Sequence, residues 1–393
     1  MKKNLALCIL LSFLCIKKNY AQFVALQDSL ALVALYDSTD GPNWFFKDHW
    51  KTTDPVSMWT GVGVYNNRVN SLSFTGNRMK GKIPASFKNL TKLERLHLLD
   101  NGLKANMGEF LDSLTSLVYF NVGELEFTNK IPESVSKLVN LQQFTLYGCF
   151  GLEHIPSSFK TMNNLTEMDI QNNGITGDIS NSIPPNVTAL NISFNKLNFD
   201  PIEKLAKRFK NNLNFYYLEQ ANILTKTDAD KVWVSAGGTV SNNTYKWYKV
   251  GSGAIDSTRG DSVYYPSSPG SYYAEVSNSI ATGLILTSNA VKALGIRASI
   301  CSGTTNATFT SDISGANYQW QKSIDSLNYT NISNNDDYSG VNSKTLNISK
   351  LQAGKYGARY RCVVDGNMST IITITFKNRW TAGIDANWEN DAN

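Results

Sequence analysis

The sequence predicts a multidomain protein in which an α/β solenoid, built around a curved parallel sheet, precedes two all-β sandwiches. An apolar frame recurs about every 24 residues between Val69 and Gln220. After Gln220 this period ends, and short alternating runs rich in Tyr, Thr, Ser and Val follow, separated by Gly, Asn and Pro. A chain of 393 residues also exceeds the size of one ordinary hydrophobic core.

Residues 1–21 have the layout of a secretory signal peptide. Two lysines precede an apolar run over 5–16, and a polar stretch ends at Ala21. The run is too short to cross a bilayer, and no later segment reads as a transmembrane segment. Lipid attachment through Cys15 is the weaker alternative, because bulky Leu14 stands where a lipobox needs a small residue. We therefore expect a secreted or extracellular protein, with attachment to the outer cell surface left open.

The charge balance bears on the class of partner. The formal net charge is +5, and removal of the four lysines within 1–21 leaves the rest of the chain near +1. This balance argues against nucleic acid as a partner. The rest of the chain keeps only Cys149, Cys301 and Cys362, and in an oxidising compartment the question is which of them pair.

Seven frames of the form L-x-x-L-x-L-x-x-N make up the repeat. They begin at Val69, Leu93, Leu117, Leu141, Leu165, Val187 and Leu213, at intervals of 24, 24, 24, 24, 22 and 26 residues. A period of this size marks a solenoid, because the apolar flank of each coil can be covered only by its neighbours. Each L-x-L alternation predicts a short strand with its apolar side chains inward. One buried column should therefore contain Leu72, Leu96, Phe120, Phe144, Met168 and Leu190.

The last position of the frame predicts a ladder of buried side-chain amides. An Asn at this position can bond turn backbone groups that would otherwise be buried unpaired. The residues that fit this role are Asn77, Asn101, Asn173 and Asn195. Leu125 and Ala221 cannot fill it, and Cys149 at the same position is expected to be a buried thiol.

The frames, together with the G-x-I-P segment at 81–84, resemble plant-type leucine-rich repeats. The resemblance implies about seven coils within 67–221. Residues 22–66 resemble the N-terminal cap of such arrays, with a short helix around Leu30–Tyr36 and three tryptophans, Trp44, Trp50 and Trp59. Plant versions flank the last Trp with two cysteines, and Ser57 and Val64 stand there in this chain. We therefore expect aromatic burial, and not a disulfide, to hold the cap.

The final module, residues 294–377, resembles an immunoglobulin-like domain. It contains Cys301, Trp320, Tyr360 and Cys362 in the order that such domains use. The resemblance implies a disulfide between Cys301 and Cys362 that bridges two sheets over Trp320. Closing that loop would contribute roughly 4 kcal/mol on the chain-entropy estimate.

Residues 222–293 repeat the same pattern around Trp247 and Tyr272, with Ala274 in place of the second cysteine. They are expected to form an immunoglobulin-like module without a disulfide. Residues 378–393, with Trp380 and Trp388, resemble the opening of Trp-rich repeats found late in large bacterial secreted proteins. We expect this stretch to be the start of a truncated repeat.

No pattern predicts catalytic residues, a metal site or a cofactor. The only histidines are His49, His97 and His154, and the sequence lacks H-E-x-x-H, C-x-x-C, G-x-S-x-G and G-x-x-x-x-G-K. A glycosidase carboxylate pair leaves no short motif and stays open. We expect no enzyme within these residues.

The outward-facing positions of the strands form the candidate ligand-binding site, on the concave face. The candidates are Arg95, His97, Tyr119, Asn121, Gln143, Tyr147, Glu167 and Asp169. A merely solvated sheet face is the alternative, although Tyr and Arg are residue types that anchor interfaces. The sequence thus favours a secreted or cell-surface binding or adhesion protein whose partner is a protein or glycan on another surface. An N-terminal targeting arm of a larger secreted enzyme and a structural stalk without a specific ligand stay open.

Overall fold

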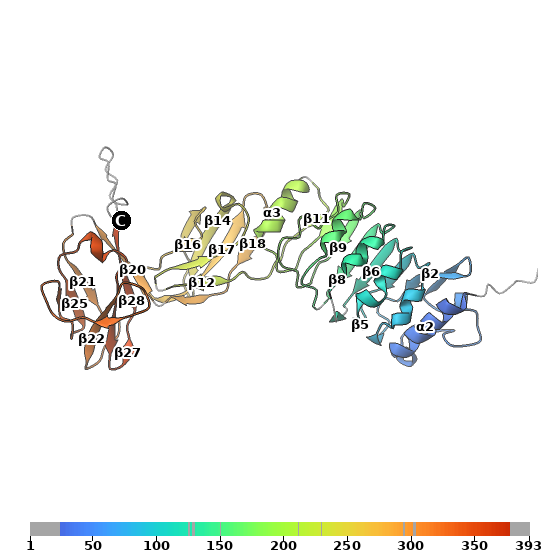
Figure 1. Ribbon diagram of the computed structural model, residues 1–393, viewed down its shortest axis with the longest axis horizontal. Helices are drawn as coiled ribbons and strands as arrows, with labels where there is room; N and C mark the ends of the chain where they lie inside the picture. Colours follow the sequence, from blue (N-terminus) through green and yellow to red (C-terminus); the bar gives the residue numbers. More distant parts are fainter. Residues whose placement is uncertain are drawn as a thin grey trace, which may run out of the picture. The chain divides into compact units, whose positions relative to one another are not determined.

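The computed structural model describes residues 24–124, 126–127, 130–149, 151–210, 212–228, 230–293, 295–301 and 304–377. The chain divides into two compact units, 1–221 and 222–393, which Figure 1 follows by colour. The expected signal peptide at 1–21 and the expected Trp-rich repeat at 378–393 lie outside the described residues.

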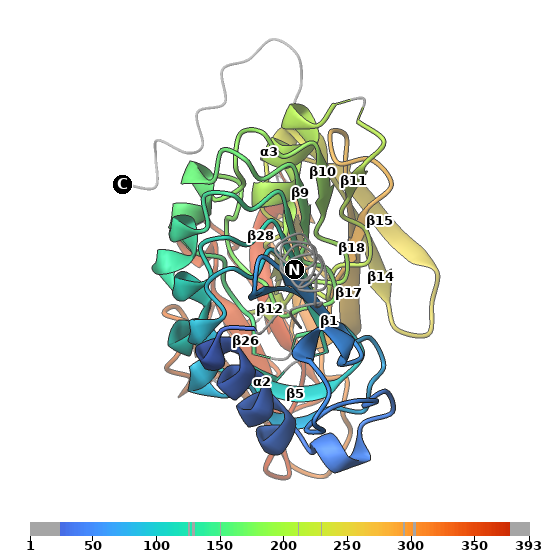
Figure 2. The same ribbon diagram turned by 90° about the vertical axis from the view of Figure 1, so that its right-hand side faces the viewer.

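The first unit is built around an eight-stranded sheet to which each coil adds one strand. The first two strands pair antiparallel, and every later neighbour is parallel. In sheet order the strands are β1 (Val62–Tyr65), β2 (Arg68–Ser73), β4 (Arg95–Leu98), β6 (Tyr119–Gly123), β8 (Gln143–Tyr147), β9 (Glu167–Asp169), β10 (Ala189–Asn191) and β11 (Phe215–Tyr216). The helices of the coils lie on the opposite side from this sheet (Figure 2), so one face of the sheet stays open.

Short helices and a small second sheet complete the coils. The helices are η3 (Ala85–Asn89), η4 (Met107–Glu109), η5 (Leu111–Ser113), η6 (Glu133–Lys137), η7 (Ser157–Thr161) and α3 (Phe199–Arg208). The second sheet consists of β3 (Lys80–Lys82), β5 (Gly102–Ala105) and β7 (Glu126–Phe127). Pro84, Pro132 and Pro156 directly precede η3, η6 and η7, where their fixed φ and missing N–H cost nothing.

The predicted apolar column is confirmed. Leu72, Leu96, Phe120, Phe144, Met168 and Leu190 lie opposite one another on successive strands, and each is at most 1% exposed. The rings of Phe120 and Phe144 stack with centroids 5.2 Å apart. Each coil therefore covers the apolar side chain of the coil before it, as the 24-residue period requires.

The amide ladder also forms. Asn101 accepts hydrogen bonds from the backbone N–H groups of Asn77 and Met79 through Oδ1, at 3.0 and 3.1 Å. Its Nδ2 donates to the carbonyls of Phe74 and Leu99, at 2.8 Å each. Asn173 and Asn195 bond neighbouring turns in the same way. Cys149 is buried, and its Sγ–H donates to the Tyr147 carbonyl at 3.3 Å. Leu125 lies outside the described residues.

The frame predicted for the last coil is wrong by one residue. Leu213, Tyr216 and Leu218, expected to point inward, are 90%, 53% and 44% exposed. Phe215 instead lies opposite Leu190 and stacks on Phe209, with centroids 5.0 Å apart. The turn position expected at Ala221 is filled by Gln220.

Gln220 performs in that coil the role that Asn performs in the others. Its Oε1 accepts from the Leu197 N–H at 3.0 Å, and its Nε2 donates to the carbonyls of Ile192 and Tyr217, at 2.9 Å each. The side chain of Gln has one methylene more than that of Asn, so it reaches the turn from a shifted position. The frame L-x-x-L-x-L-x-x-N requires Asn at its last position, so it could not reveal that Gln220 replaces this Asn.

Packed aromatic rings hold the cap, as predicted. Its helices are α2 (Leu26–Ser38), which contains the expected 30–36 helix, η1 (Gly41–Asn43) and η2 (Val56–Met58). The Trp50 ring lies 4.9 Å from the Trp44 ring, 4.8 Å from the Trp59 ring and 5.7 Å from the Phe74 ring of the first coil. The indole N–H groups of Trp44 and Trp50 donate to the carbonyls of Thr39 and Thr60, so burial leaves them satisfied.

The second unit begins with a module of two sheets around the buried Trp247 and Tyr272. One sheet consists of β12 (Thr225–Thr227), β13 (Val232–Val234) and β16 (Val263–Tyr264). The other consists of β15 (Ala254–Arg259), β14 (Asn243–Lys249), β17 (Gly270–Asn278) and β18 (Ile285–Thr287), with β19 (Val291–Ala293) on β17. The helix η8 (Val240–Asn242) precedes β14.

The last module also has two sheets, and both contribute to one core around Trp320 and Tyr360. The larger sheet consists of β20 (Gly295–Cys301), β28 (Ile371–Lys377), β26 (Arg359–Val364), β22 (Tyr318–Ser323) and β23 (Thr330–Asn331), with β27 (Asn367–Met368) on β26. The smaller sheet consists of β21 (Ala307–Thr310), β25 (Thr345–Ile348) and β24 (Tyr338–Ser339), and η9 (Ala353–Lys355) precedes β26.

The predicted disulfide between Cys301 and Cys362 is contradicted. Both cysteines lie in the larger sheet, with β28 between their strands. Cys301 pairs with Lys377 at one end of β28, whereas Tyr360, two residues before Cys362, pairs with Ile372 near its other end. A disulfide needs Cα atoms about 4.4–6.8 Å apart, which this register forbids.

Cys362 is a buried free thiol. Burial raises the pKa of the Cys362 thiol, and the neighbouring side chain of Ser311, which directly follows β21 of the other sheet, acts in the opposite direction. Ser311 therefore faces Cys362 where the sequence led us to expect a second cysteine. The error arose because Cys301 lies on β20, one strand before β21.

Candidate functional site

The eight candidate residues come together on the open face of the first unit's sheet. Four neighbouring strands carry them: β4 has Arg95 and His97, β6 has Tyr119 and Asn121, β8 has Gln143 and Tyr147, and β9 has Glu167 and Asp169. Parallel pairing aligns Arg95, Tyr119, Gln143 and Glu167 in one row, and His97, Asn121, Thr145 and Asp169 in the next. We call these eight residues the open-face patch.

Aromatic side chains give the patch its apolar surface. The Arg95 guanidinium lies 5.3 Å from the centroid of the Tyr119 ring, within the range of a cation–π contact. Tyr147 and Leu99 converge over Gly123, where an added Cβ would lie only 3.0 Å from Tyr147 Cδ1 and 2.8 Å from Leu99 Cδ2. The absence of a side chain at Gly123 therefore lets these two residues approach each other.

A half-buried pair occupies the centre of the patch. His97 lies opposite Asn121 on the next strand. Burial, and secondarily the positive charge of Arg95, lower the pKa of His97, which favours the neutral ring. Among the described residues the Asn121 Oδ1 has no hydrogen-bond partner although the atom is buried. A buried amide oxygen without a partner costs free energy that a ligand N–H or O–H could recover.

The patch has opposite charges at its two ends. Asp169 accepts from the N–H and from Nε2 of Gln171, at 3.1 Å each, and burial raises the pKa of Asp169. Arg95 and Glu167 lie in the same row, three strands apart, which corresponds to about 14 Å. The patch thus runs from a basic end over Tyr119 and Asn121 to an acidic end.

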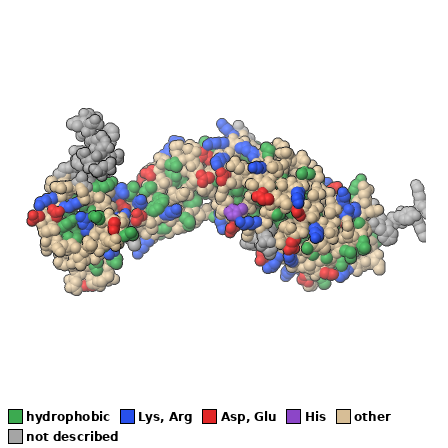
Figure 3. Space-filling model, in the orientation of Figure 1, with side chains coloured by type: hydrophobic (Ala, Val, Ile, Leu, Met, Phe, Trp, Pro, Cys, Tyr) green, Lys and Arg blue, Asp and Glu red, His purple; other side chains and the backbone are tan. Residues whose placement is uncertain are grey.

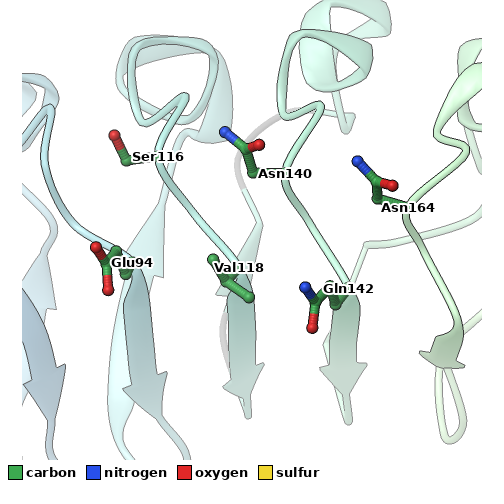
Figure 4. Close-up of a pocket in the computed structure, with 6 residues that line it drawn as sticks. All are labelled: Glu94, Ser116, Val118, Asn140, Gln142 and Asn164. Carbon is green, nitrogen blue, oxygen red and sulfur yellow. The ribbon is translucent and has the colours of Figure 1, made fainter.

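A second, polar groove lies at the edge where these strands begin. It encloses about 390 Å³ and is lined by Glu94, Ser116, Val118, Asn140, Gln142 and Asn164 (Figure 4). Three of these side chains already bond the preceding coil: Ser116 donates to the Thr91 carbonyl, Asn140 to that of Thr115 and Asn164 to that of Val139. The groove therefore offers fewer free polar groups than the open-face patch.

These side chains belong to an edge ladder that the sequence analysis missed. Asn186 and Asn212 continue it, donating to the carbonyls of Asn163 and Thr188 at 2.7 and 2.6 Å. The signal was present in the sequence, because each Asn directly precedes the first apolar residue of a frame. Its role is structural, since each amide caps a turn of the neighbouring coil.

The other two histidines stand apart from the patch. His49 Nδ1 lies 2.8 Å from the Asp54 carboxylate in the cap, and His154 is exposed. The described part of the chain contains no group of three His, Cys, Asp or Glu residues placed to hold a metal ion.

None of the helices in the described part of the chain is long and apolar enough to cross a membrane. On the visible face in Figure 3, acidic and basic side chains are interspersed over the first unit without forming a basic stripe.

Two stretches of the chain match known families. Residues 164–185 match the family described as Leucine Rich Repeat. Residues 292–378, which contain the last β module, match a family described as a domain of unknown function, DUF8696.

Similar proteins occur in Arabidopsis thaliana. A probable leucine-rich repeat receptor-like protein kinase is 36% identical over 95 residues, or 24% of this chain and 10% of that protein. Disease resistance protein UNI is 28% identical over 134 residues, or 32% of this chain and 15% of that protein. The chain thus spans less than a fifth of the length of these relatives. Among solved structures, a plant ice-binding protein has a TM-score of 0.41 and 20% identity, over 47% of this chain and 61% of that one.

The first unit thus has the construction of leucine-rich repeats: its coils stack their apolar residues in register, close their turns with side-chain amides and match the repeat family over residues 164–185.

Proposed function

We propose that the protein is a secreted or cell-surface binding protein that recognises a protein or glycan ligand through the open-face patch. The observation that carries this proposal is the buried, unpartnered Oδ1 of Asn121 at the centre of the patch. A merely solvated sheet face would leave such an oxygen in contact with water. Tyr119 and Tyr147 on either side supply the aromatic surface that anchors interfaces.

The charges of the patch restrict the ligand further. Arg95 suits a carboxylate or another anionic group at one end, and Glu167 and Asp169 suit an amine or hydroxyl donors at the other. A ligand that donates a hydrogen bond to Asn121 lies between them. Such a ligand is extended across several strands, as a peptide segment or a glycan chain can be.

The two β modules are proposed to be immunoglobulin-like spacers that present the repeats for adhesion outside the cell. Their two-sheet construction around buried Trp247 and Trp320 supports this role. The receptor-like kinase among the relatives supports a binding role for the repeats, although the match covers only a small part of that protein. The alternative function, a targeting arm of a larger secreted enzyme, also requires the open-face patch to bind a ligand. The other alternative, a structural stalk without a specific ligand, does not require it.

A screen of the chain from Gln22 to Asn393 against protein and glycan arrays tests the proposal. The test variant is Asn121→Leu, which keeps the approximate size of the side chain and removes the hydrogen-bond acceptor. The wild-type chain is screened beside it. Binding that the wild type shows and the variant loses supports the open-face patch. Equal binding by both chains places recognition elsewhere, and absence of binding to both arrays favours the stalk.

A further inference from the structure

The larger sheet of the last module carries a row of polar side chains on its outer face. Strand pairing aligns the four members of this row, one from each of four neighbouring strands: Arg297 of β20, Thr373 of β28, Arg359 of β26 and Ser323 of β22. Ile372, next to Thr373 along β28, belongs to the core of the module. Because side chains alternate along a strand, the row lies on the face opposite the core.

This polar row is buried although it lies outside the core. Thr373 and Ser323 are 4% and 2% exposed, and the side chain of Arg359 is 12% exposed. Among the described residues the Thr373 hydroxyl, which is also buried, has no hydrogen-bond partner. The outer face of an antiparallel sheet is commonly solvated, so solvent is excluded here from a face that would otherwise meet water.

The turn between β12 and β13 of the preceding module brings two carboxylates to this row. Arg297 Nε donates to Asp230 Oδ2 at 3.1 Å, and Arg359 Nη2 donates to Asp228 Oδ2 at 3.4 Å. The Asp230 side chain is only 4% exposed. The Asp228 N–H donates to the Lys231 carbonyl at 3.0 Å and closes the turn. The turn therefore holds both carboxylates in place opposite the two arginines.

The Arg297 guanidinium also lies against an aromatic ring of the preceding module. Its central carbon is 3.4 Å from the centroid of the Tyr265 ring, and Tyr265 directly follows β16. A planar guanidinium at this distance stacks on the ring, which an ammonium group cannot do. Arg297 is thus held by a carboxylate and a ring that both belong to the other module.

We propose that these contacts dock the two β modules onto each other and make them one rigid body. The covalent connection alone permits bending, because a single residue separates β19 from β20 and each residue has two rotatable backbone dihedrals. Asp228 and Asp230 on one side match Arg297 and Arg359 on the other in charge. Separating the modules would leave buried charges without their partners, which opposes bending. The two modules therefore act as one stiff spacer.

Pulsed electron paramagnetic resonance on the chain from Gln22 to Asn393 tests this proposal by measuring the distance between the modules. Spin labels are attached to cysteines that replace Ser257 in the preceding module and Ser333 in the last one, both exposed. Every chain also carries Cys301→Ser, and the other two cysteines are buried. With the junction intact, the labels should give one narrow distribution of distances.

Two pairs of substitutions remove the charges from either side of the junction. Arg297→Met/Arg359→Met removes both guanidinium groups at similar side-chain length and should replace the narrow distribution with a broad one. Asp228→Asn/Asp230→Asn removes both carboxylate charges at nearly constant size and should broaden the distribution as well. The matched control is Arg259→Met, which removes a guanidinium that donates to a carbonyl of its own module, and it should keep the narrow distribution. Circular dichroism confirms that all chains are folded.

A broad distribution in the chain with the intact junction would overturn the proposal. So would a narrow distribution that neither pair of substitutions changes, or an equal broadening in Arg259→Met. The measurement needs no ligand, so each of these outcomes leaves the function proposed for the open-face patch to its own test.

Discussion

The carboxylate of Asp28 and the guanidinium of Arg68 form two hydrogen bonds of 2.9 Å each, from Nε to Oδ2 and from Nη2 to Oδ1. They join α2 of the cap to β2 of the repeat sheet. The Asp28 side chain is fully buried and also accepts from the Val69 N–H at 2.9 Å. The hydrogen bond to Asp28 raises the pKa of Arg68. The pair therefore stabilises the junction only as long as both partners are present.

We expect Asp28→Ala to destabilise the first unit by on the order of 3–5 kcal/mol, because it leaves the Arg68 charge half-buried without its partner. Urea unfolding measures the change. The control is Asp37→Ala, which removes the exposed ion pair with Lys51 at 2.7 Å and should cost less than about 1 kcal/mol. Equal midpoints for the two variants would contradict the role of the buried pair.

The two amide ladders should differ in their contribution to stability. Asn101→Ala removes the partners of the Asn77 and Met79 N–H groups and of two carbonyls. Each buried group left unpaired costs about 1–3 kcal/mol. Asn164→Ala removes one exposed hydrogen bond to the Val139 carbonyl, and water can replace it, so the change should stay within about 0.5 kcal/mol. Thermal unfolding of both variants measures the difference, and similar losses would refute the distinction.

The solenoid could be predicted from the sequence because its signal is repeated. Each apolar position recurs several times, so the buried column was predicted correctly from Leu72 to Leu190. The last coil was predicted wrongly because it has no following frame to fix its register. There Gln220 substitutes for Asn, and a longer side chain shifted by one residue leaves no trace in the pattern.

The prediction of a disulfide was wrong for a different reason. The order of Cys301, Trp320 and Cys362 says nothing about which strand carries Cys301, and strand pairing decides whether two cysteines can meet.

The members of the open-face patch could be predicted from the alternation in each strand. Their chemistry could not, since the buried, unpartnered acceptor of Asn121 and the approach of Tyr147 and Leu99 to Gly123 depend on neighbours 24 residues away.

Cys362 should behave as a buried thiol. Burial raises its pKa, so the reactive thiolate is scarce at neutral pH. We expect iodoacetamide to modify Cys362 only after unfolding, and reductant to leave the melting temperature unchanged. Peptide mapping without reduction checks the pairing directly. A Cys301–Cys362 linked peptide, or a melting temperature that falls with reductant, would contradict the register of β20 and β26.

His97 should make stability depend on pH. Its pKa is lowered from 6.5 in the folded protein, mainly by burial, so the unfolded chain binds the proton more readily. The folded state therefore loses stability as pH falls through about 6.5 towards the lower folded value, and is unaffected above that range. We expect His97→Gln to flatten this part of the profile between about pH 5 and 7, measured by urea unfolding. His154→Gln, at an exposed position, is the control and should keep the wild-type slope.

Ligand binding should depend on the two tyrosines that flank the centre of the open-face patch. Tyr119 lies under the Arg95 guanidinium, and Tyr147 adjoins Leu99 over Gly123. Neither belongs to the buried column, so truncation should leave the fold intact. If either ring is an interface anchor, replacing it with Ala should weaken binding by on the order of 1–3 kcal/mol.

The double variant Tyr119→Ala/Tyr147→Ala, tested by calorimetry with a ligand found on the arrays, checks this expectation. Lys88→Ala in η3, on the helical side of the solenoid, is the control and should bind as the wild type does. Circular dichroism confirms that all three chains are folded. Unchanged affinity in the double variant would remove the open-face patch from recognition and move the search to the β modules of the second unit.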